Sequence, residues 1–108
     1  MAAAKISTKP DYERRLSLEE VRGRKVMITR DALEVFPRVG KMFTLEVNRK
    51  KFTSSIYAQS CQCQGPGKSH EHYWLNTKEI LGAVPWKPRL TLAFRKSSDT
   101  AYILTIRE

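Results

Sequence analysis

The sequence predicts a mainly β protein: a small, closed or nearly closed barrel with two or three short helices at its ends. Three observations lead to this fold class. Stretches in which apolar and polar residues alternate are short and numerous, as over residues 42–48 and 89–95. The predicted helices have one or two turns, which is too short to cover an open sheet but long enough to close the ends of a barrel. The chain has 108 residues, 41% of them hydrophobic, and is predicted to form a single domain over residues 1–108 with one modest core.

The N-terminal part is predicted to contain one helical turn before the first regular strand. Residues 1–16 show no clear period and are expected to form a flexible N-terminal arm or one additional strand. Ser17 and Glu20 have the spacing of a capping box, in which each side chain satisfies a backbone N–H group of the other residue. Gly23 stops the helix, which therefore has one turn at most.

A strand, a second short helix and a hairpin are predicted next. Residues 24–30 are rich in side chains that favour strands. Asp31 is a suitable N-cap for a short helix, which Pro37 ends. The alternation over residues 42–48 predicts a strand, and residues 52–62 are predicted to form one long strand that pairs with it.

The C-terminal part is predicted to contain a third short helix between strands. The strands are expected over residues 70–75, 89–95 and 101–107. Asn76 is the predicted N-cap of the helix over residues 77–81, and Glu79 has the capping-box position. Gly82 then ends this helix.

Positive charge dominates the composition. The chain has 20 Lys and Arg against 11 Asp and Glu, a formal net charge of +9. Such an excess on a small domain indicates a polyanionic partner, which is DNA, RNA or an anionic membrane. No apolar run is long enough to span a bilayer, and the N-terminus lacks the apolar stretch of a secretory signal, so a membrane partner is not expected. Cys61 and Cys63 are too close in sequence for an unstrained disulfide, and this cysteine usage is typical of a reducing compartment.

The order of these elements resembles the B-three domain, a DNA-binding pseudobarrel of plant transcription factors and of the effector domains of bacterial restriction endonucleases. The resemblance covers residues 22–108. It rests on an apolar strand and a helix that ends in Phe-Pro, an aromatic strand that leads into a helix, and two closing strands. The corresponding segments are Lys25–Arg30, Ala32–Pro37, Tyr73–Lys78, Arg89–Phe94 and Tyr102–Arg107. The resemblance implies a seven-stranded open pseudobarrel that binds double-stranded DNA sequence-specifically.

Two segments carry side chains suited to DNA. Residues 62–72 join two strands as a protruding hairpin, and a two-stranded ribbon of this kind fits the major groove. In the family that the chain resembles, this hairpin is the C-terminal recognition arm, and residues 22–25 correspond to the N-terminal arm. Gly23 lets the backbone of that arm approach DNA closely. The predicted DNA-binding residues, able to contact base edges or phosphates, are Arg22, Arg24, Lys25, Gln62, Gln64, Lys68, Ser69, His70 and His72.

The same hairpin allows a second interpretation, a zinc site. Cys61, Cys63, His70 and His72 would share one face of the ribbon if Cys63 pairs opposite His70 and Cys61 pairs opposite His72. Paired zinc-binding cysteines usually have about two to four residues between them, and four ligands on one flat face give a poor tetrahedron. We therefore expect no bound metal and no cofactor. The cysteines are then small packing residues, and the histidines face solvent or DNA.

Other basic and aromatic residues are assigned structural roles. Arg49, Lys50 and Lys51 are predicted to form a solvated hairpin turn, with phosphate contact as the alternative. Trp74 and Trp86 flank the third predicted helix. We expect them to lie in the core and in a lid over it, rather than to stack on bases.

An enzymatic role is not expected. No Asp or Glu has Lys two residues later, the spacing that a restriction-type nuclease site requires, and no nucleophile elbow or phosphate-binding glycine loop is present. The predicted function is that of a monomeric double-stranded DNA-binding domain that works with a nuclease or regulatory domain of a parent protein. It would act in the bacterial cytoplasm at the nucleoid or in a plant nucleus. The alternatives are a small basic RNA-binding β-barrel and a zinc-stabilised hairpin module that binds protein.

Overall fold

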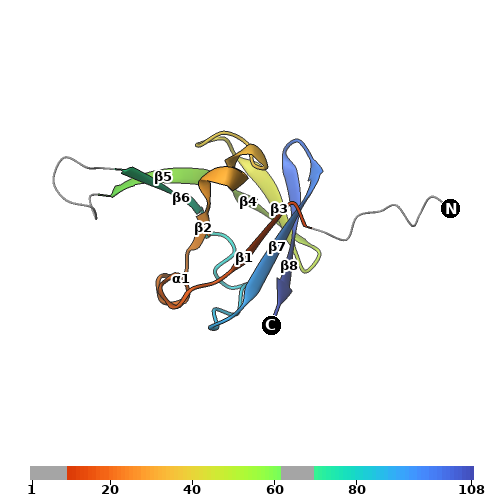
Figure 1. Cartoon of the computed structure of the whole chain (residues 1–108). Coiled ribbons are helices and arrows are strands. Elements are labelled where there is room, and N and C mark those ends of the chain that lie inside the picture. The colour runs from red at the N-terminus through yellow and green to blue at the C-terminus, as the bar shows by residue number, and fades with distance from the viewer. Residues whose placement is uncertain (1–9, 62–69) are drawn as a thin grey trace.

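The computed structural model describes residues 10–61 and 70–108, whose strands form two β-sheets (Figure 1). The larger sheet has five strands, in the order β1 (Tyr12–Arg15), β7 (Thr91–Ser98), β8 (Ala101–Arg107), β3 (Phe43–Val47) and β4 (Lys50–Ser54). The smaller sheet has three strands, in the order β2 (Val26–Ile28), β6 (His70–Leu75) and β5 (Ile56–Cys61). Helix α1 (Leu18–Gly23) precedes β2, and the 3-10 helix η2 (Arg30–Glu34) follows it.

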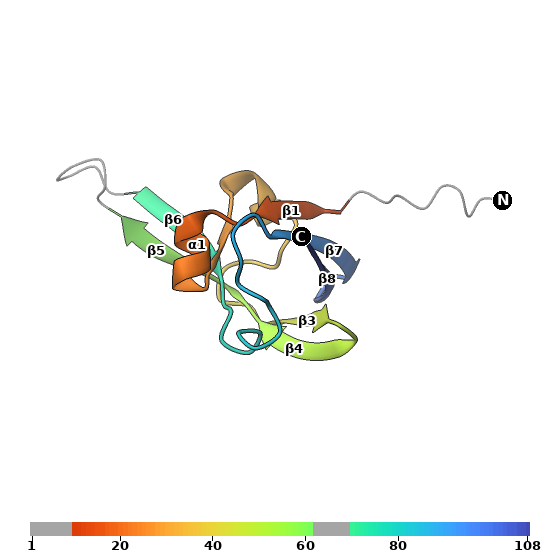
Figure 2. The same ribbon diagram turned by 90° about the horizontal axis from the view of Figure 1, so that it is seen from below.

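The sheets confirm the open pseudobarrel. Seen from below in Figure 2, the five-stranded sheet curves around the interior from β1 to β4, and α1 and the β5–β6 hairpin lie on its open side. β3 and β8 are parallel neighbours, a pairing that brings the last strand against the middle of the chain. No helix in the described part of the chain is long and apolar enough to cross a membrane.

The described residues form eight strands rather than seven, because the long strand predicted over residues 52–62 divides at Ser55. β4 belongs to one sheet and β5 to the other. Ser54 and Ser55 are buried at the division. The hydroxyl of Ser54 donates to the carbonyl oxygen of Asn76 at 2.7 Å, and the N–H group of Asn76 donates to the carbonyl oxygen of Ser55 at 2.8 Å. These bonds satisfy buried polar groups where the strand leaves one sheet for the other.

Aromatic rings fill the interior around Phe36, the residue before the predicted helix-ending proline. The Phe36 ring lies 5.0–5.9 Å, between centroids, from the rings of Tyr12, Phe43, Phe94 and Tyr102. The Tyr102 hydroxyl is satisfied because it donates to a backbone carbonyl oxygen at 2.6 Å. Burial raises the pKa of Tyr102 to about 12, so this tyrosine stays neutral inside the barrel.

The flexible-arm prediction is wrong for the part of residues 1–16 that the structure describes. Tyr12 and Leu16 are buried, and β1 pairs with β7 in the larger sheet. The Tyr12 hydroxyl donates to the carbonyl oxygen of Met27 at 2.6 Å. Residues 10–16 therefore belong to the barrel wall, as the alternative of an additional strand predicted, while residues 1–9 lie outside the described part.

Two of the three predicted helices form. The capping box of α1 is present in full, as predicted from Ser17 and Glu20. The second helix is η2, but Thr29 rather than Asp31 is its N-cap, and no side chain caps it. The predicted helix over residues 77–81 is wrong: this segment is a series of turns. Glu79 does not close a capping box there, because its carboxylate accepts the N–H group of Thr53 on the edge strand β4, at 2.8 Å.

Candidate nucleic-acid interface

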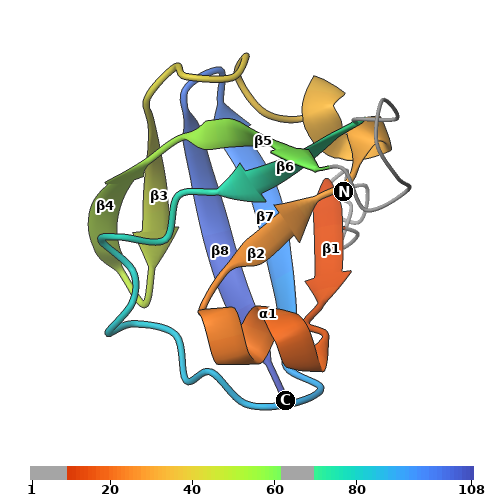
Figure 3. The ribbon, with the colours of Figure 1, turned by 90° about the vertical axis from the view of Figure 1, so that its left-hand side faces the viewer.

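Two projecting segments lie on the same side of the molecule. The loop that follows α1 and the β5–β6 hairpin both extend to the left of the barrel in Figure 1. Figure 3 turns this side toward the viewer, with α1 below and β2, β6 and β5 crossing above it. We call Arg22, Gly23, Arg24 and Lys25 the basic loop. The β3–β4 turn, which carries Arg49 and Lys50, lies on the other side of the barrel.

The basic loop has a fixed backbone at the end of α1. Arg24 adopts the left-handed conformation, with φ 52° and ψ 51°, and its N–H group bonds back to the helix. The N–H group of Lys25 donates to the carbonyl oxygen of Glu20 at 3.0 Å. α1 includes Gly23, so the residue that ends it in the left-handed region is Arg24, a conformation that a side chain makes costly. Arg22 and Arg24 are exposed, and Lys25 is half-buried.

Glu20 holds both ends of the basic loop. Its carboxylate, 2% exposed, forms a salt bridge of 2.7 Å with the guanidinium of Arg14. It also accepts the N–H group of Ser17 at 3.0 Å and that of Met27 at 2.8 Å, so it joins α1 to β2 across the loop. Burial alone would raise the pKa of Glu20, but the hydrogen bonds from Arg14, Met27 and Ser17 outweigh burial and lower this pKa.

A second contact fixes the loop from the turn after β6. The hydroxyl of Thr77 donates to the carbonyl oxygen of Arg24 at 2.8 Å. The next residue, Lys78, is exposed and adds a cation beside the basic loop that sequence reasoning missed. The strand-to-turn boundary at Asn76 could have suggested the turn, but nothing in the sequence pairs Thr77 with a residue 53 positions earlier.

Replacing Thr77 by valine is expected to lower the free energy of unfolding by about 0.5–1.5 kcal/mol. Valine keeps the branched shape but cannot donate to Arg24. Urea unfolding measures the effect, with Thr105→Val on the exposed face of β8 as the matched control, expected to stay within about 0.5 kcal/mol. Equal stabilities of the two variants would show that the Thr77 hydrogen bond does not hold the loop.

The outer side of the smaller sheet lies between the basic loop and the described end of the β5–β6 hairpin. Val26, Ile56 and Leu75 point into the core, so the residues that alternate with them point outward. Cross-strand neighbours on this outer side are Met27 with Trp74, Trp74 with Tyr57, and His72 with Gln59. We call this surface the arm face; its described residues are Met27, Tyr57, Gln59, His72 and Trp74.

The arm face refines the role assigned to one aromatic residue, Trp74, whereas Trp86 keeps its predicted role. Trp74 is buried as predicted, with only 6% of its surface exposed, but its side chain lies on the arm face, outside the main core cluster. The ammonium of Lys25 lies 4.2 Å from the centroid of its ring. Trp86 does pack partly against the core, and its Nε1 donates to the carbonyl oxygen of Leu81 at 3.2 Å, which agrees with a lid. The alternation that puts His72 on the outer face also places Trp74 there, so the sequence contained the signal.

Only some of the predicted DNA-binding residues belong to the part of the chain that the structure describes. His72 is half-buried on the arm face, and the backbone of His70 pairs with Cys61 at the end of the described hairpin. The predicted DNA-binding residues Gln62, Gln64, Lys68 and Ser69 lie outside the described residues. Gln59 is an exposed residue of this face that sequence reasoning missed.

The strand register of the hairpin differs from the pairing that the predicted zinc site assumed. Cys61 pairs opposite His70, and His72 pairs opposite Gln59, so Cys61 and His72 are not cross-strand neighbours. Among the described residues, no three His, Cys, Asp or Glu side chains gather where they could hold a metal ion. Cys63, the fourth member of the proposed set, is outside that part of the chain.

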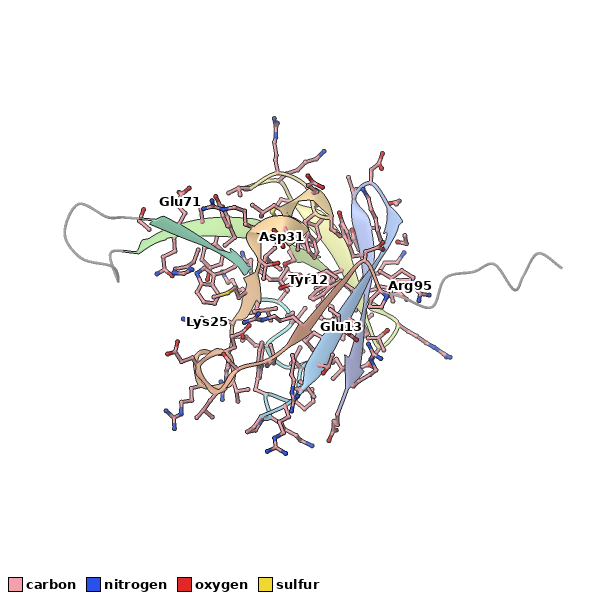
Figure 4. All side chains as sticks on the ribbon, viewed as in Figure 1. Tyr12, Glu13, Lys25, Asp31, Glu71 and Arg95 are labelled. Atoms are coloured by element: carbon pink, nitrogen blue, oxygen red, sulfur yellow. The ribbon has the colours of Figure 1, made fainter. Side chains whose placement is uncertain are left out.

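The hairpin has one side that faces the basic loop and one that faces away. In Figure 4, Glu71 lies on the far side, and Lys25 lies on the side toward α1. The Tyr73 hydroxyl, on the same side as Glu71, points to its carboxylate. The exposed carboxylate of Glu71 therefore lies on the side of the hairpin opposite Lys25.

Comparison with solved structures identifies this architecture. No protein-family model and no curated protein sequence matches the chain. The N-terminal domain of Helicobacter pylori LlaJI.R1 matches with a TM-score of 0.65 and 16% sequence identity, over 90% of this chain and 86% of that one. FUS3 in an Arabidopsis FUS3–DNA complex matches with a TM-score of 0.69 and 15% identity, over 93% of this chain and 98% of that one. The chain has the B-three fold. The resemblance inferred from the order of elements is thus confirmed at the level of the fold.

Proposed function

We propose that the protein is a sequence-specific double-stranded DNA-binding domain that inserts the basic loop and the β5–β6 hairpin into the major groove. The observation that carries the proposal is the position of these segments: both project from one side of a fold shared with FUS3 in a DNA complex. Arg22, Arg24 and Lys25 lie on this side, and these side chains bind phosphates and guanine.

The chemistry of the arm face supports a duplex over single-stranded RNA. Proteins that read single-stranded RNA usually offer exposed aromatic rings to splayed bases. On the arm face, Trp74 is covered by the Lys25 side chain, and Tyr57, 43% exposed, is the accessible ring among the described residues. Gln59 and His72 instead offer polar groups of the kind that contact base edges.

We expect substitutions in the two arms to flatten the sequence preference. Arg24→Ala in the basic loop, and Gln62→Ala or Lys68→Ala in the hairpin, should each cost about 1–3 kcal/mol on the preferred site and relax the preference at one base position. The measurement is the binding profile over a randomised duplex library.

Lys50→Ala is the matched control for this experiment. Lys50 is an exposed cation on the β3–β4 turn, away from both arms, so its removal should leave the preferred sequence unchanged. If the preferred site survived all three arm substitutions, the specificity would have to come from another surface of the barrel, and the two-arm proposal would be wrong.

As a recognition module, the domain needs no catalytic group or cofactor of its own. We propose that it acts as a monomer and directs a nuclease or regulatory domain of a parent protein to its site. Its location then follows the DNA, in the bacterial nucleoid or in a plant nucleus. A nuclease assay with the isolated domain and Mg²⁺ tests this role: cleavage of duplex DNA would contradict it.

A further inference from the structure

Lys25 is held in place from two sides. Its ammonium lies 4.2 Å from the centroid of the Trp74 ring, within the range of a cation–π contact. Its aliphatic part passes Gly23 so closely that a Cβ atom there would lie 3.2 Å from Cε and 3.4 Å from Cδ. The absence of a side chain at Gly23 therefore leaves the space through which Lys25 reaches the ring.

A contribution to stability does not by itself explain why residue 74 is a tryptophan. Its Nε1 atom is buried and has no hydrogen-bond acceptor among the described residues. A buried N–H group without an acceptor destabilises the folded state, and such a group in a protein calls for a reason. Phenylalanine would fill the same place on the outer face of β6 without this cost, but its ring attracts a cation less strongly than the indole does.

We propose that Trp74 is a positioning residue for DNA binding. The Trp74 ring and the space left by the missing side chain of Gly23 together hold the Lys25 ammonium on the arm face, between the basic loop and the hairpin. In this position the ammonium can contact a DNA phosphate. A free lysine side chain loses rotamer freedom when it binds, and fixing it beforehand reduces that loss. This inference rests on the proposed function, and it makes Trp74 act through Lys25 rather than by stacking on a base.

The first test measures where Lys25 lies, without DNA. A proton above an aromatic ring has an upfield-shifted NMR signal, so the ε-protons of Lys25 should be shifted in the unmodified chain and not in Trp74→Leu. Gly23→Ala should reduce the shift, because the new Cβ atom displaces the lysine. Gly82→Ala is the matched control, since a Cβ atom there meets nothing within 4 Å. An unshifted Lys25 signal in the unmodified chain would overturn the proposal.

The second test is a double-mutant cycle on duplex DNA. Lys25→Ala and Trp74→Leu should each weaken binding by about three- to tenfold, and the double variant should bind no more weakly than Lys25→Ala alone. Trp74→Phe, which keeps a ring that attracts a cation less strongly, should restore only part of the affinity. Additive losses, or full affinity in Trp74→Leu, would contradict the positioning role.

The two tests separate this inference from the proposed function. If the unmodified chain binds no duplex at low salt, the proposed function is wrong and Trp74 loses its role in DNA binding, even if the NMR shift shows Lys25 on the ring. If the chain binds duplex DNA and the cycle is additive, DNA binding stands and the positioning role of Trp74 is wrong. Trp86→Phe changes an indole that packs partly against the core and is not part of the arm face, so it should leave both readouts unchanged.

Discussion

Replacing Glu20 by alanine is expected to lower the free energy of unfolding by up to about 3–5 kcal/mol, the cost of breaking a fully buried ion pair, because Glu20 is buried while its partner Arg14 is 25% exposed. The Glu20 carboxylate is 2% exposed and accepts hydrogen bonds from Arg14, Ser17 and Met27. Alanine leaves the guanidinium of Arg14 without its partner and two N–H groups without acceptors. Urea unfolding measures the loss, and a small domain with a total stability of about 5–15 kcal/mol would be close to its limit.

The same network makes the stability depend on pH. The pKa of Glu20 is lower in the folded chain than its ordinary value of 4.5, so folding favours the ionised carboxylate. Its contribution is fully present above the unfolded-state pKa and is lost as the pH falls through the folded-state pKa. Glu20→Gln should therefore remove part of the decline in stability below pH 4.5, and parallel curves for both proteins would contradict this assignment.

Glu19→Ala is the control for Glu20→Ala because it changes an exposed carboxylate on the same helical turn. Its loss removes only a favourable interaction with the N-terminal end of α1, about 0.3–1 kcal/mol. Similar effects at both positions would mean that the helix terminus, rather than the buried ion pair, accounts for the stability. We also expect Glu20→Ala to weaken DNA binding, because Glu20 holds both ends of the basic loop in place.

Local sequence signals predicted the parts of the fold that local interactions determine. The capping box of Ser17 and Glu20 forms because its two hydrogen bonds join residues three apart. The alternation of Phe43, Leu45 and Val47 predicted β3 because one face of that strand is buried and the other is not. In both cases the residues that determine the element lie close together in sequence, so the sequence pattern is enough to predict it.

Long-range contacts determined what the sequence did not reveal. Ser55 divides a strand with uninterrupted β-forming character, because the polar groups of Asn76 bind at the division. Glu79 has a capping-box position but bonds to Thr53, 26 residues earlier, so its helix does not form. The position of Trp74 is a different case. The alternation along β6 predicts that its side chain lies on the outer face, but the side chain was assigned to the core because it is large and apolar.

Affinity for duplex DNA is expected to fall by about two to four orders of magnitude between about 50 and 200 mM salt. Each phosphate neutralised by a cation contributes about −0.9 to the slope of log affinity against log salt, and we expect roughly four to seven such contacts. The structure offers the exposed Arg22, Arg24 and Lys78 and the positioned Lys25, and the sequence places Lys68 in the hairpin tip. The slope is measured by titrating a labelled duplex at several salt concentrations.

The slope also identifies which cations take part. Removing a cation that contacts a phosphate should reduce the slope by about one and weaken all sequences alike. We expect that result for Arg22→Ala and Lys78→Ala. Arg95→Ala, an exposed cation on β7 on the other side of the barrel (Figure 4), should change neither slope nor affinity. An affinity independent of salt would mean that phosphate contacts do not drive binding. An equal effect of Arg95→Ala would mean that the net charge of +9 attracts DNA without a defined interface. Either result would contradict the two-arm proposal.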